Sequence, residues 1–159
     1  MPRPSSLLLM ALFSCLLMLL GNPARVLAQG SHEGPAITVH RTADCGCCTA
    51  WEDHLKASGF AVTDVVSDNL AELKTSHGIT EELESCHTAL VEGYVIEGHV
   101  PASAVQRLLK ERPAINGLSA PGMPMGSPGM DEDGITPEPY VVVAIHGNGT
   151  TSVFERHGF

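Results

Sequence analysis

Four cysteines carry the chemistry that this sequence suggests. Cys45, Cys47 and Cys48 lie within one four-residue stretch, and Cys86 stands directly before His87. The reactivity of a free cysteine, more than its packing, usually decides where it is found. Such a cluster indicates a structural disulfide, a redox-active dithiol or a site for a soft metal ion.

The first three of these cysteines are expected at the start of a helix. The alternating pattern of Ile37–Arg41 predicts a strand, the helical pattern begins at Cys47 or Cys48, and Gly59 is a suitable stop. At a helix N-terminus the free backbone N–H groups and the positive end of the dipole stabilise a thiolate. A thiolate both attacks disulfides and binds metal, so this position explains reactivity without choosing between the two uses.

Cys86 and His87 favour a metal. In a thioredoxin-type fold, the loop that leads into the strand predicted at Thr88–Val91 packs beside the Cys-x-x-Cys motif, so four sulfurs and an imidazole would converge. A dithiol oxidoreductase needs only two sulfurs. Thiolates and thioethers select Cu(I), and zinc is second because its sites more often show two separated Cys-x-x-Cys pairs. Adjacent Cys47 and Cys48 cannot comfortably chelate one ion, which favours bridging sulfurs and more than one Cu(I).

Two other interpretations stay open. Cys45 or Cys48 could attack a disulfide, with Cys86 as the resolving thiol, which would make the protein a thiol–disulfide oxidoreductase. Alternatively, Cys86 could be bonded to one cysteine of the cluster in a small stapled interaction domain. The sequence leaves open whether the protein turns over a substrate.

Three methionines repeat the theme of soft donors. Met123, Met125 and Met130 fall in Pro121–Met130, within a Pro/Gly-rich segment (Ala114–Pro139) for which no regular structure is predicted. Long structureless loops in compact domains tend to be functional or disordered. Because the loop offers no helix face for core packing, the thioethers either capture Cu(I) or anchor the loop by burial.

Of the eight histidines, His87 is the best candidate ligand. His99, just before Pro101, is expected to be structural, and His54 on the first helix is expected at the surface. The direction of His40 on the first strand cannot be read. The remaining histidines are expected to be exposed to solvent: His32, His77, His146 and His157. No Ser-His-Asp or paired-carboxylate arrangement stands out.

The N-terminus has the features of a secretory signal peptide. Arg3 supplies a positive charge, Leu7–Leu20 is apolar, and Val26–Ala28 offers small residues at the usual cleavage positions. The apolar run is shorter than the roughly 20 residues of a membrane-spanning helix. We therefore expect export to the periplasm without a membrane anchor. The expected organisation is a signal peptide (1–28), a flexible tail (29–36) and one domain (37–159).

The chain is acidic, with a formal net charge of −9, and two arginines would leave with the signal peptide. Nucleic-acid binding depends on Lys and Arg side chains that neutralise phosphates, so this charge argues against it. An acidic surface suits metal cations, but it is also an ordinary means of staying soluble.

The hydrophobic pattern predicts the other elements of an α/β domain. Further strands are expected at 60–66, 88–91, 94–96, 140–145 and 151–154, with hairpin turns at Glu92–Gly93 and Asn148–Gly149. Further helices are expected after Asp68 as the N-cap, over a short turn at 79–84, and from Pro101 to Pro113. This order predicts a thioredoxin-like sheet flanked by helices, followed by the long Pro/Gly/Met loop and a C-terminal β-hairpin.

Several segments resemble a known family, the CopG-like periplasmic proteins associated with bacterial copper resistance. The similar segments are Cys45–Cys48 with Trp51 and His54, Ser85–Ala89, Gly93–Tyr94, Glu97–Pro101 and Gly117–Met130. The resemblance extends over roughly Ile37–Phe154. It implies a thioredoxin-like domain that binds copper through its cysteines, with a role in copper redox chemistry or copper handling.

The sequence thus favours an exported protein that binds copper as Cu(I). The expected ligands are Cys45, Cys47, Cys48 and Cys86, assisted by His87, with Met123, Met125 and Met130 guiding ions in. The expected partners are copper ions and other exported copper-handling proteins.

Overall fold

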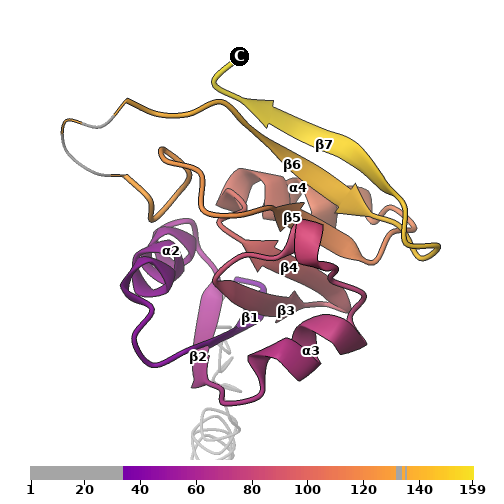
Figure 1. Cartoon of the computed structure of the whole chain (residues 1–159), viewed down its shortest axis with the longest axis horizontal. Helices are drawn as coiled ribbons and strands as arrows, with labels where there is room; N and C mark the ends of the chain where they lie inside the picture. The colour runs from indigo at the N-terminus through magenta and orange to yellow at the C-terminus, as the bar shows by residue number, and fades with distance from the viewer. Residues whose placement is uncertain (1–33, 132–133, 135) are drawn as a thin grey trace, which may run out of the picture. The chain divides into compact units, whose positions relative to one another are not determined.

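Seven strands form one mixed sheet in the order β2-β1-β3-β4-β5-β6-β7 (Figure 1). The computed structural model describes residues 34–131, 134 and 136–159. Its strands are β1 (Ala36–Arg41), β2 (Ala61–Val66), β3 (His87–Val91), β4 (Tyr94–Gly98), β5 (Gly117–Ala120), β6 (Tyr140–Ile145) and β7 (Thr151–His157). Its helices are α2 (Gly46–Ala57), α3 (Leu70–Ser76), η2 (Glu81–Leu83) and α4 (Ala102–Glu111).

The strand directions are compatible with the expected thioredoxin-like core. β1 is parallel to β2, and β3 lies antiparallel between β1 and β4. β5 continues the sheet parallel to β4, and the hairpin of β6 and β7 completes it in antiparallel fashion. The expected fold class, an α/β sheet flanked by helices, is confirmed.

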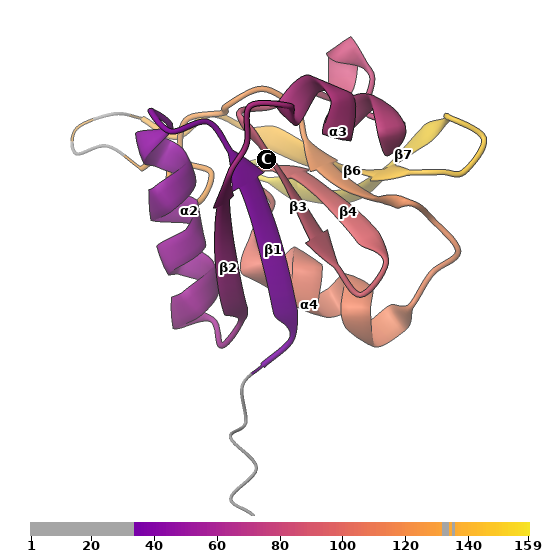
Figure 2. The same cartoon turned by 90° about the horizontal axis from the view of Figure 1, so that it is seen from below.

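Helices cover both faces of the sheet, because alternate residues of each strand point to opposite sides. On one face, Trp51 of α2 and Leu108 of α4 pack with Ala89 and Ile96 in the main core. On the other face, Leu83 of η2 belongs to a smaller cluster that includes Val95. Figure 2 shows α3 and α4 on opposite sides of the sheet.

The short strand β5 lies where the sequence predicted only a loop, so that prediction was wrong. Gly117–Ala120 is short and has no β-branched residue, and its four residues are all buried between β4 and β6. Gly117 is required there, because a Cβ at this position would collide with the backbone carbonyl of Val95. Close approach of two backbones, and not side-chain propensity, builds this strand.

The start of α3 also differs from its prediction. The N-cap is Asn69, not Asp68, and it makes no side-chain cap hydrogen bond. Instead, the hydroxyl of Ser67 accepts a hydrogen bond from the backbone N–H of Asn69 at 3.2 Å. The side chain that satisfies the free N–H therefore lies two residues before the cap.

The predicted signal peptide and the first part of the predicted tail lie outside the described residues. At the described end of the tail, the carbonyl of Pro35 accepts the N–H of Ala61 at 3.1 Å, and β1 begins at Ala36. Among the residues that the structure describes, no helix is both long enough and apolar enough to cross a bilayer.

Candidate metal centre

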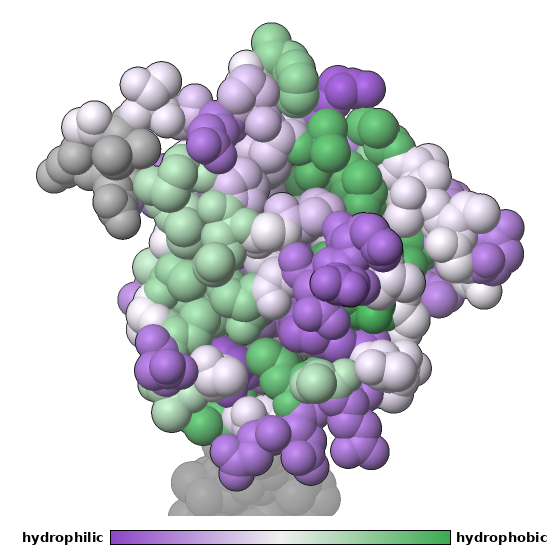
Figure 3. All heavy atoms as spheres, viewed as in Figure 1, coloured by the Kyte–Doolittle hydropathy of each residue, from purple (hydrophilic) through white to green (hydrophobic). Residues whose placement is uncertain are grey.

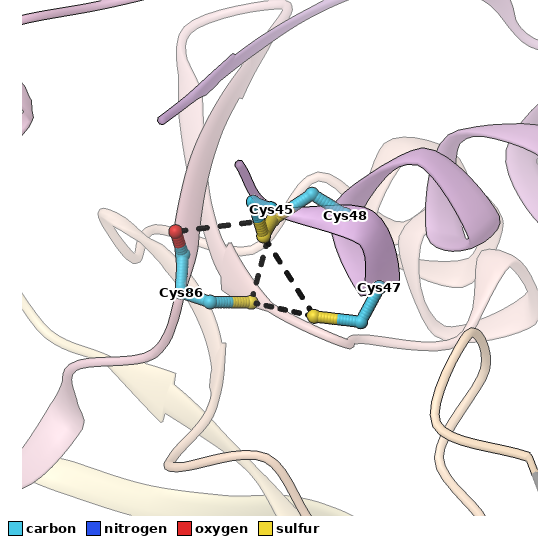
Figure 4. A group of neighbouring side chains, drawn as sticks. All are labelled: Cys45, Cys47, Cys48 and Cys86. Carbon is cyan, nitrogen blue, oxygen red and sulfur yellow. Dashed lines mark hydrogen bonds between the residues drawn. A yellow bond between two sulfur atoms is a disulfide. The ribbon is translucent and has the colours of Figure 1, made fainter. Parts of the chain in front are cut away.

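Two segments far apart in the sequence meet at one end of β1 and β3. The helix α2 begins at Gly46 with Cys45 as its N-cap, shortly after β1 ends. β3 runs antiparallel to β1, with Arg41 opposite His87. Because the end of one strand lies beside the start of the other, the first turn of α2 faces Cys86 (Figure 4).

Four sulfurs converge at this junction. The Sγ atom of Cys86 lies 3.5 Å from that of Cys48 and 3.8 Å from that of Cys47, and Cys47 lies 3.7 Å from Cys45. All four Sγ atoms lie within 4.8 Å of one another. The structure therefore brings together the four cysteines that the sequence singled out.

The four sulfurs are not all thiols in this structure. Cys45 and Cys48 form a disulfide with a Cα–Cα distance of 5.4 Å, while Cys47 and Cys86 are free. Opening the disulfide takes two electrons and two protons and gives four thiols. A metal ion held by four thiolates therefore requires the reduced protein, since a disulfide sulfur is no longer a thiolate.

His99 joins the cluster, although the sequence suggested a structural role for it. Its Nε2 atom lies 3.0 Å from Cys86 Sγ, and its Nδ1 atom lies 2.8 Å from the carbonyl oxygen of Pro128. A carbonyl only accepts hydrogen bonds, so Nδ1 carries the proton and Nε2 directs its lone pair at the cluster. Such a backbone partner fixes the tautomer of many metal-binding histidines.

The register of the β3–β4 hairpin could have predicted that His99 lies beside Cys86. The predicted turn at Glu92–Gly93 pairs Thr88 with Glu97. The same register, carried two residues further, sets Cys86 opposite His99. Side chains directly opposite in an antiparallel pair lie close enough to interact.

His87 also faces Cys86, as the sequence predicted. Its Nδ1 atom lies 3.3 Å from Cys86 Sγ, and its ring packs 4.3 Å from the ring of Trp51. Its Nε2 atom is buried and has no hydrogen-bond partner among the described residues. His87, His99 and Cys86 thus form a second group of donor atoms that shares one sulfur with the first.

The electrostatics of the site favour neutral side chains. Burial lowers the pKa of His99 and holds the pKa of His87 well below its usual value, so both rings are neutral at pH 7. Neutral imidazole is the form that binds metal. Burial, reinforced by the nearby Cys47, raises the pKa of Cys86 to about 12. A metal ion at this sulfur must displace its proton.

The methionine loop (Pro121–Met130) is held beside the four cysteines at two points. Near its start, the hydroxyl of Ser85 donates to the carbonyl of Gly122, whose N–H donates to the carbonyl of Glu84 at 2.9 Å. Further along, the carbonyl of Pro128 accepts a hydrogen bond from His99 Nδ1, and Gly129 lies against the backbone of α2. Figure 3 shows mildly hydrophobic surface over α2 and this loop.

The three methionines differ in exposure. Met123 lies between the two fastened points and is 52% exposed, whereas Met125 and Met130 are half-buried. The backbone of the loop is also tied by hydrogen bonds, from Met130 N–H to Ser127 O at 2.8 Å and from Glu138 N–H to Met125 O at 2.8 Å. These backbone bonds hold the loop without help from the thioether of Met123. Copper capture by the three methionines stays a prediction.

The other histidines lie apart from the donor groups. His54 is half-buried and not at the surface as expected, because its Nε2 atom accepts the N–H of Ala102 at the start of α4, at 3.0 Å. His40, also half-buried, lines an open groove beside α3. Three histidines that were expected to be exposed are half-buried in the structure: His77, His146 and His157. His32 lies outside the described residues.

Gly129 gives a direct test of how the loop is seated. Its φ is +83°, and a Cβ would lie 2.7 Å from the N atom of Trp51 and 2.9 Å from the carbonyl oxygen of Cys47. Gly129→Ala should lower the free energy of unfolding by about 1–3 kcal/mol, because it adds a collision with α2 to left-handed backbone strain. Urea denaturation measures this loss.

Gly134 is a matched control for that substitution. It has the same φ of +83°, but a Cβ there would meet open space. Gly134→Ala should therefore cost only the strain of about 1–2 kcal/mol or less. Equal losses for the two variants would show that the loop is not packed on α2.

Part of the chain matches a known family model. A family model described as "Protein of unknown function, DUF411" matches residues 83–130, which include Cys86, His99 and the methionine loop. A comparison with curated protein sequences gave no match.

Two solved structures of copper resistance protein CopG resemble the chain over most of its length. The structure described as form 2 has a TM-score of 0.74 and 43% sequence identity, and the match covers 79% of this chain and 99% of the other. Form 1 has a TM-score of 0.73 and 43% identity, with 78% and 98% covered. With this identity over nearly the whole solved chain, the protein belongs to the CopG family of copper resistance proteins.

Proposed function

We propose that this protein is an exported copper-binding protein that holds Cu(I) through Cys45, Cys47, Cys48 and Cys86 once the disulfide is reduced. The observation that carries the proposal is the convergence of four sulfurs, within 4.8 Å of one another, from two segments 38 residues apart. Solved relatives named as copper resistance proteins support copper as the metal.

The donor set suits a soft cation. Thiolate sulfur prefers Cu(I), zinc and iron–sulfur clusters over hard cations such as magnesium or calcium. Two neutral imidazoles, those of His87 and His99, border the same sulfur of Cys86. Because Cys86 belongs to both donor groups, its sulfur is placed to bridge two ions, which supports binding of more than one Cu(I).

Further parts of the proposal concern the route of copper to and from the site. Met123, exposed on the fastened loop, would hand ions to the cluster through its thioether. The apolar N-terminal stretch supports export to the periplasm. We propose copper ions and other exported copper-handling proteins as its partners.

A Cu(I) titration tests the proposed function. Fully reduced protein is titrated with Cu(I) in the presence of a chromophoric chelator, under anaerobic conditions. We expect at least one tightly held equivalent, and much weaker binding to protein in which the Cys45–Cys48 disulfide is intact. If reduced protein fails to compete with the chelator, the proposed function is wrong.

One observation supports a second function, thiol–disulfide exchange. The Sγ atom of Cys86 lies 3.5 Å from Cys48. Attack of a Cys86 thiolate on Cys48 would form a Cys48–Cys86 bond, break the Cys45–Cys48 bond and release Cys45 as a thiolate. However, burial raises the pKa of Cys86 to about 12, so at pH 7 this cysteine is far less ionised than an ordinary cysteine.

This protonated state predicts that Cys86 contributes little to disulfide exchange in the metal-free protein. Wild-type protein and the Cys86→Ser variant should therefore reduce insulin at the same low rate at pH 7. A wild-type rate at least about tenfold above that of the variant would favour the oxidoreductase, because thiolate availability limits such exchange.

A further inference from the structure

An ion pair is buried behind the cysteine cluster, on the side of the sheet away from α2. Lys74 of α3 and Glu97 of β4 are 5% and 0% exposed, and Lys74 Nζ contacts Glu97 Oε1. Taking two charges out of water costs several kcal/mol per ion, so a buried pair is weak evidence for stability. The hydrogen bonds that the two side chains make to neighbouring residues indicate a role other than stability.

Both members of the pair bind the backbone of Ser85. Lys74 Nζ donates to the carbonyl of Ser85 at 3.0 Å, and Glu97 Oε1 accepts the N–H of Ser85 at 2.7 Å. Both polar backbone groups of the residue next to Cys86 are therefore held by charged side chains. Hydrogen bonds to charged groups are stronger than those between neutral groups.

The same pair also binds Thr88, which follows His87. The hydroxyl of Thr88 accepts a hydrogen bond from Lys74 at 3.2 Å and donates to Glu97 Oε2 at 2.7 Å. Ser85 and Thr88 stand immediately before and after the dipeptide Cys86-His87. The ion pair thus holds the residue before and the residue after Cys86-His87 by hydrogen bonds.

Steric contacts confine Ser85 further. Gly98, with a φ of +71°, lies so close that a Cβ there would collide with the side chain of Ser85. The hydroxyl of Ser85 in turn binds the carbonyl of Gly122 in the methionine loop. Ser85 is therefore fixed by groups from α3, β4 and the loop at once.

We propose that Lys74 and Glu97 are positioning residues that set the place of Cys86 relative to the sulfurs of Cys45, Cys47 and Cys48, and thereby the affinity of the site for Cu(I). The part that concerns Cu(I) affinity rests on the proposed function. The part that concerns the position of Cys86 rests on the hydrogen bonds and contacts of Ser85 and Thr88. Neither residue belongs to the two donor groups, and both act through Ser85 and Thr88, on either side of Cys86-His87.

The test begins with Glu97→Gln, which keeps the shape of the side chain and removes its charge. Cu(I) affinity should fall about 10–100-fold, the usual effect of losing a group that orients a metal ligand. Lys74→Met should act in the same direction. Val142→Ala, a change at a fully buried core residue of β6, controls for loss of stability alone and should leave the affinity unchanged.

A double-mutant cycle separates positioning from general destabilisation. If Glu97 acts through Cys86, then adding Glu97→Gln to Cys86→Ser should change Cu(I) affinity by no more than about twofold, because the two changes share one route. The proposal is overturned if Glu97→Gln lowers the Cu(I) affinity equally in the wild-type and Cys86→Ser proteins. It is also overturned if Glu97→Gln lowers the affinity in neither. If Glu97→Gln does not fold, Thr88→Val removes one hydroxyl from the same network and replaces it in the cycle.

A metal-free measurement distinguishes failure of this proposal from failure of the proposed function. With the Cys45–Cys48 disulfide closed, Cys47 and Cys86 are the free thiols of the described domain. Iodoacetamide pulses followed by peptide mass mapping give the ratio of their alkylation rates. Glu97→Gln should raise the Cys86 to Cys47 ratio at least about threefold by loosening the segment that holds Cys86, while Val142→Ala leaves it unchanged. An unchanged ratio in Glu97→Gln contradicts positioning, whatever the copper titration shows.

Discussion

Replacing Cys86 by serine should weaken Cu(I) binding by more than about 100-fold, beyond what loss of an orienting group alone costs. Cys86 lies 3.5 Å and 3.8 Å from the sulfurs of Cys48 and Cys47 and also faces both imidazoles, so it joins the two donor groups. A serine hydroxyl is a hard donor that Cu(I) binds poorly. Competition titration of the reduced variant measures the loss.

The control for that substitution is Ser85→Cys in the Cys86→Ser background, which returns a sulfur one residue away. The hydroxyl of Ser85 donates to the carbonyl of Gly122 and lies 4.0 Å from Cys86 Sγ, outside the group of four sulfurs, so a sulfur at this position should not restore the Cu(I) affinity. Tight binding by Cys86→Ser alone would remove this residue from the site. The sulfurs of Cys45, Cys47 and Cys48 would then be the remaining cysteine ligands.

Replacing Trp51 by alanine should lower the free energy of unfolding by about 3–5 kcal/mol, the usual cost of deleting a buried aromatic side chain. Trp51 is fully buried, packs against His87, and donates its indole N–H to the carbonyl of Val100 at 2.8 Å. Val100 follows His99, so the same side chain supports both imidazoles of the site. Urea denaturation followed by circular dichroism measures the loss, because Trp51 is the single tryptophan of the chain.

Trp51→Phe is the matched variant for the indole. It retains most of the aromatic volume and leaves the Val100 carbonyl buried without its donor, which costs about 1–3 kcal/mol. The expected order of stability is therefore wild type, then Phe, then Ala. A loss below about 1 kcal/mol for Trp51→Ala would contradict the central place of this residue in the core.

Much of the fold follows from local patterns in the sequence. Alternation at Ile37–Arg41, the turn at Glu92–Gly93 and the Asn148–Gly149 turn predict strands that the structure contains. These signals are strong because each is set by neighbouring residues. The location of Cys86 beside α2 also follows, since it needs only the expected order of strands.

The parts that could not be predicted depend on contacts between distant residues. β5 exists because Gly117 allows its backbone to approach that of Val95, which no local pattern reports. The hairpin register sets His99 opposite Cys86, but the orientation of its ring depends on the carbonyl of Pro128, 29 residues further along the chain. The burial of Lys74 could not be predicted either, because its partner Glu97 lies three elements further along the chain, in β4.

The central claim is that copper binds to the converged sulfurs of the reduced protein. X-ray absorption at the copper edge, on reduced protein loaded with one equivalent of Cu(I), tests this most directly. The predicted result is a Cu(I) edge with sulfur as the dominant atom bound to copper, lost when Cys86 and Cys48 are both replaced by serine. A spectrum fitted by nitrogen and oxygen neighbours alone, unchanged by those substitutions, would contradict it.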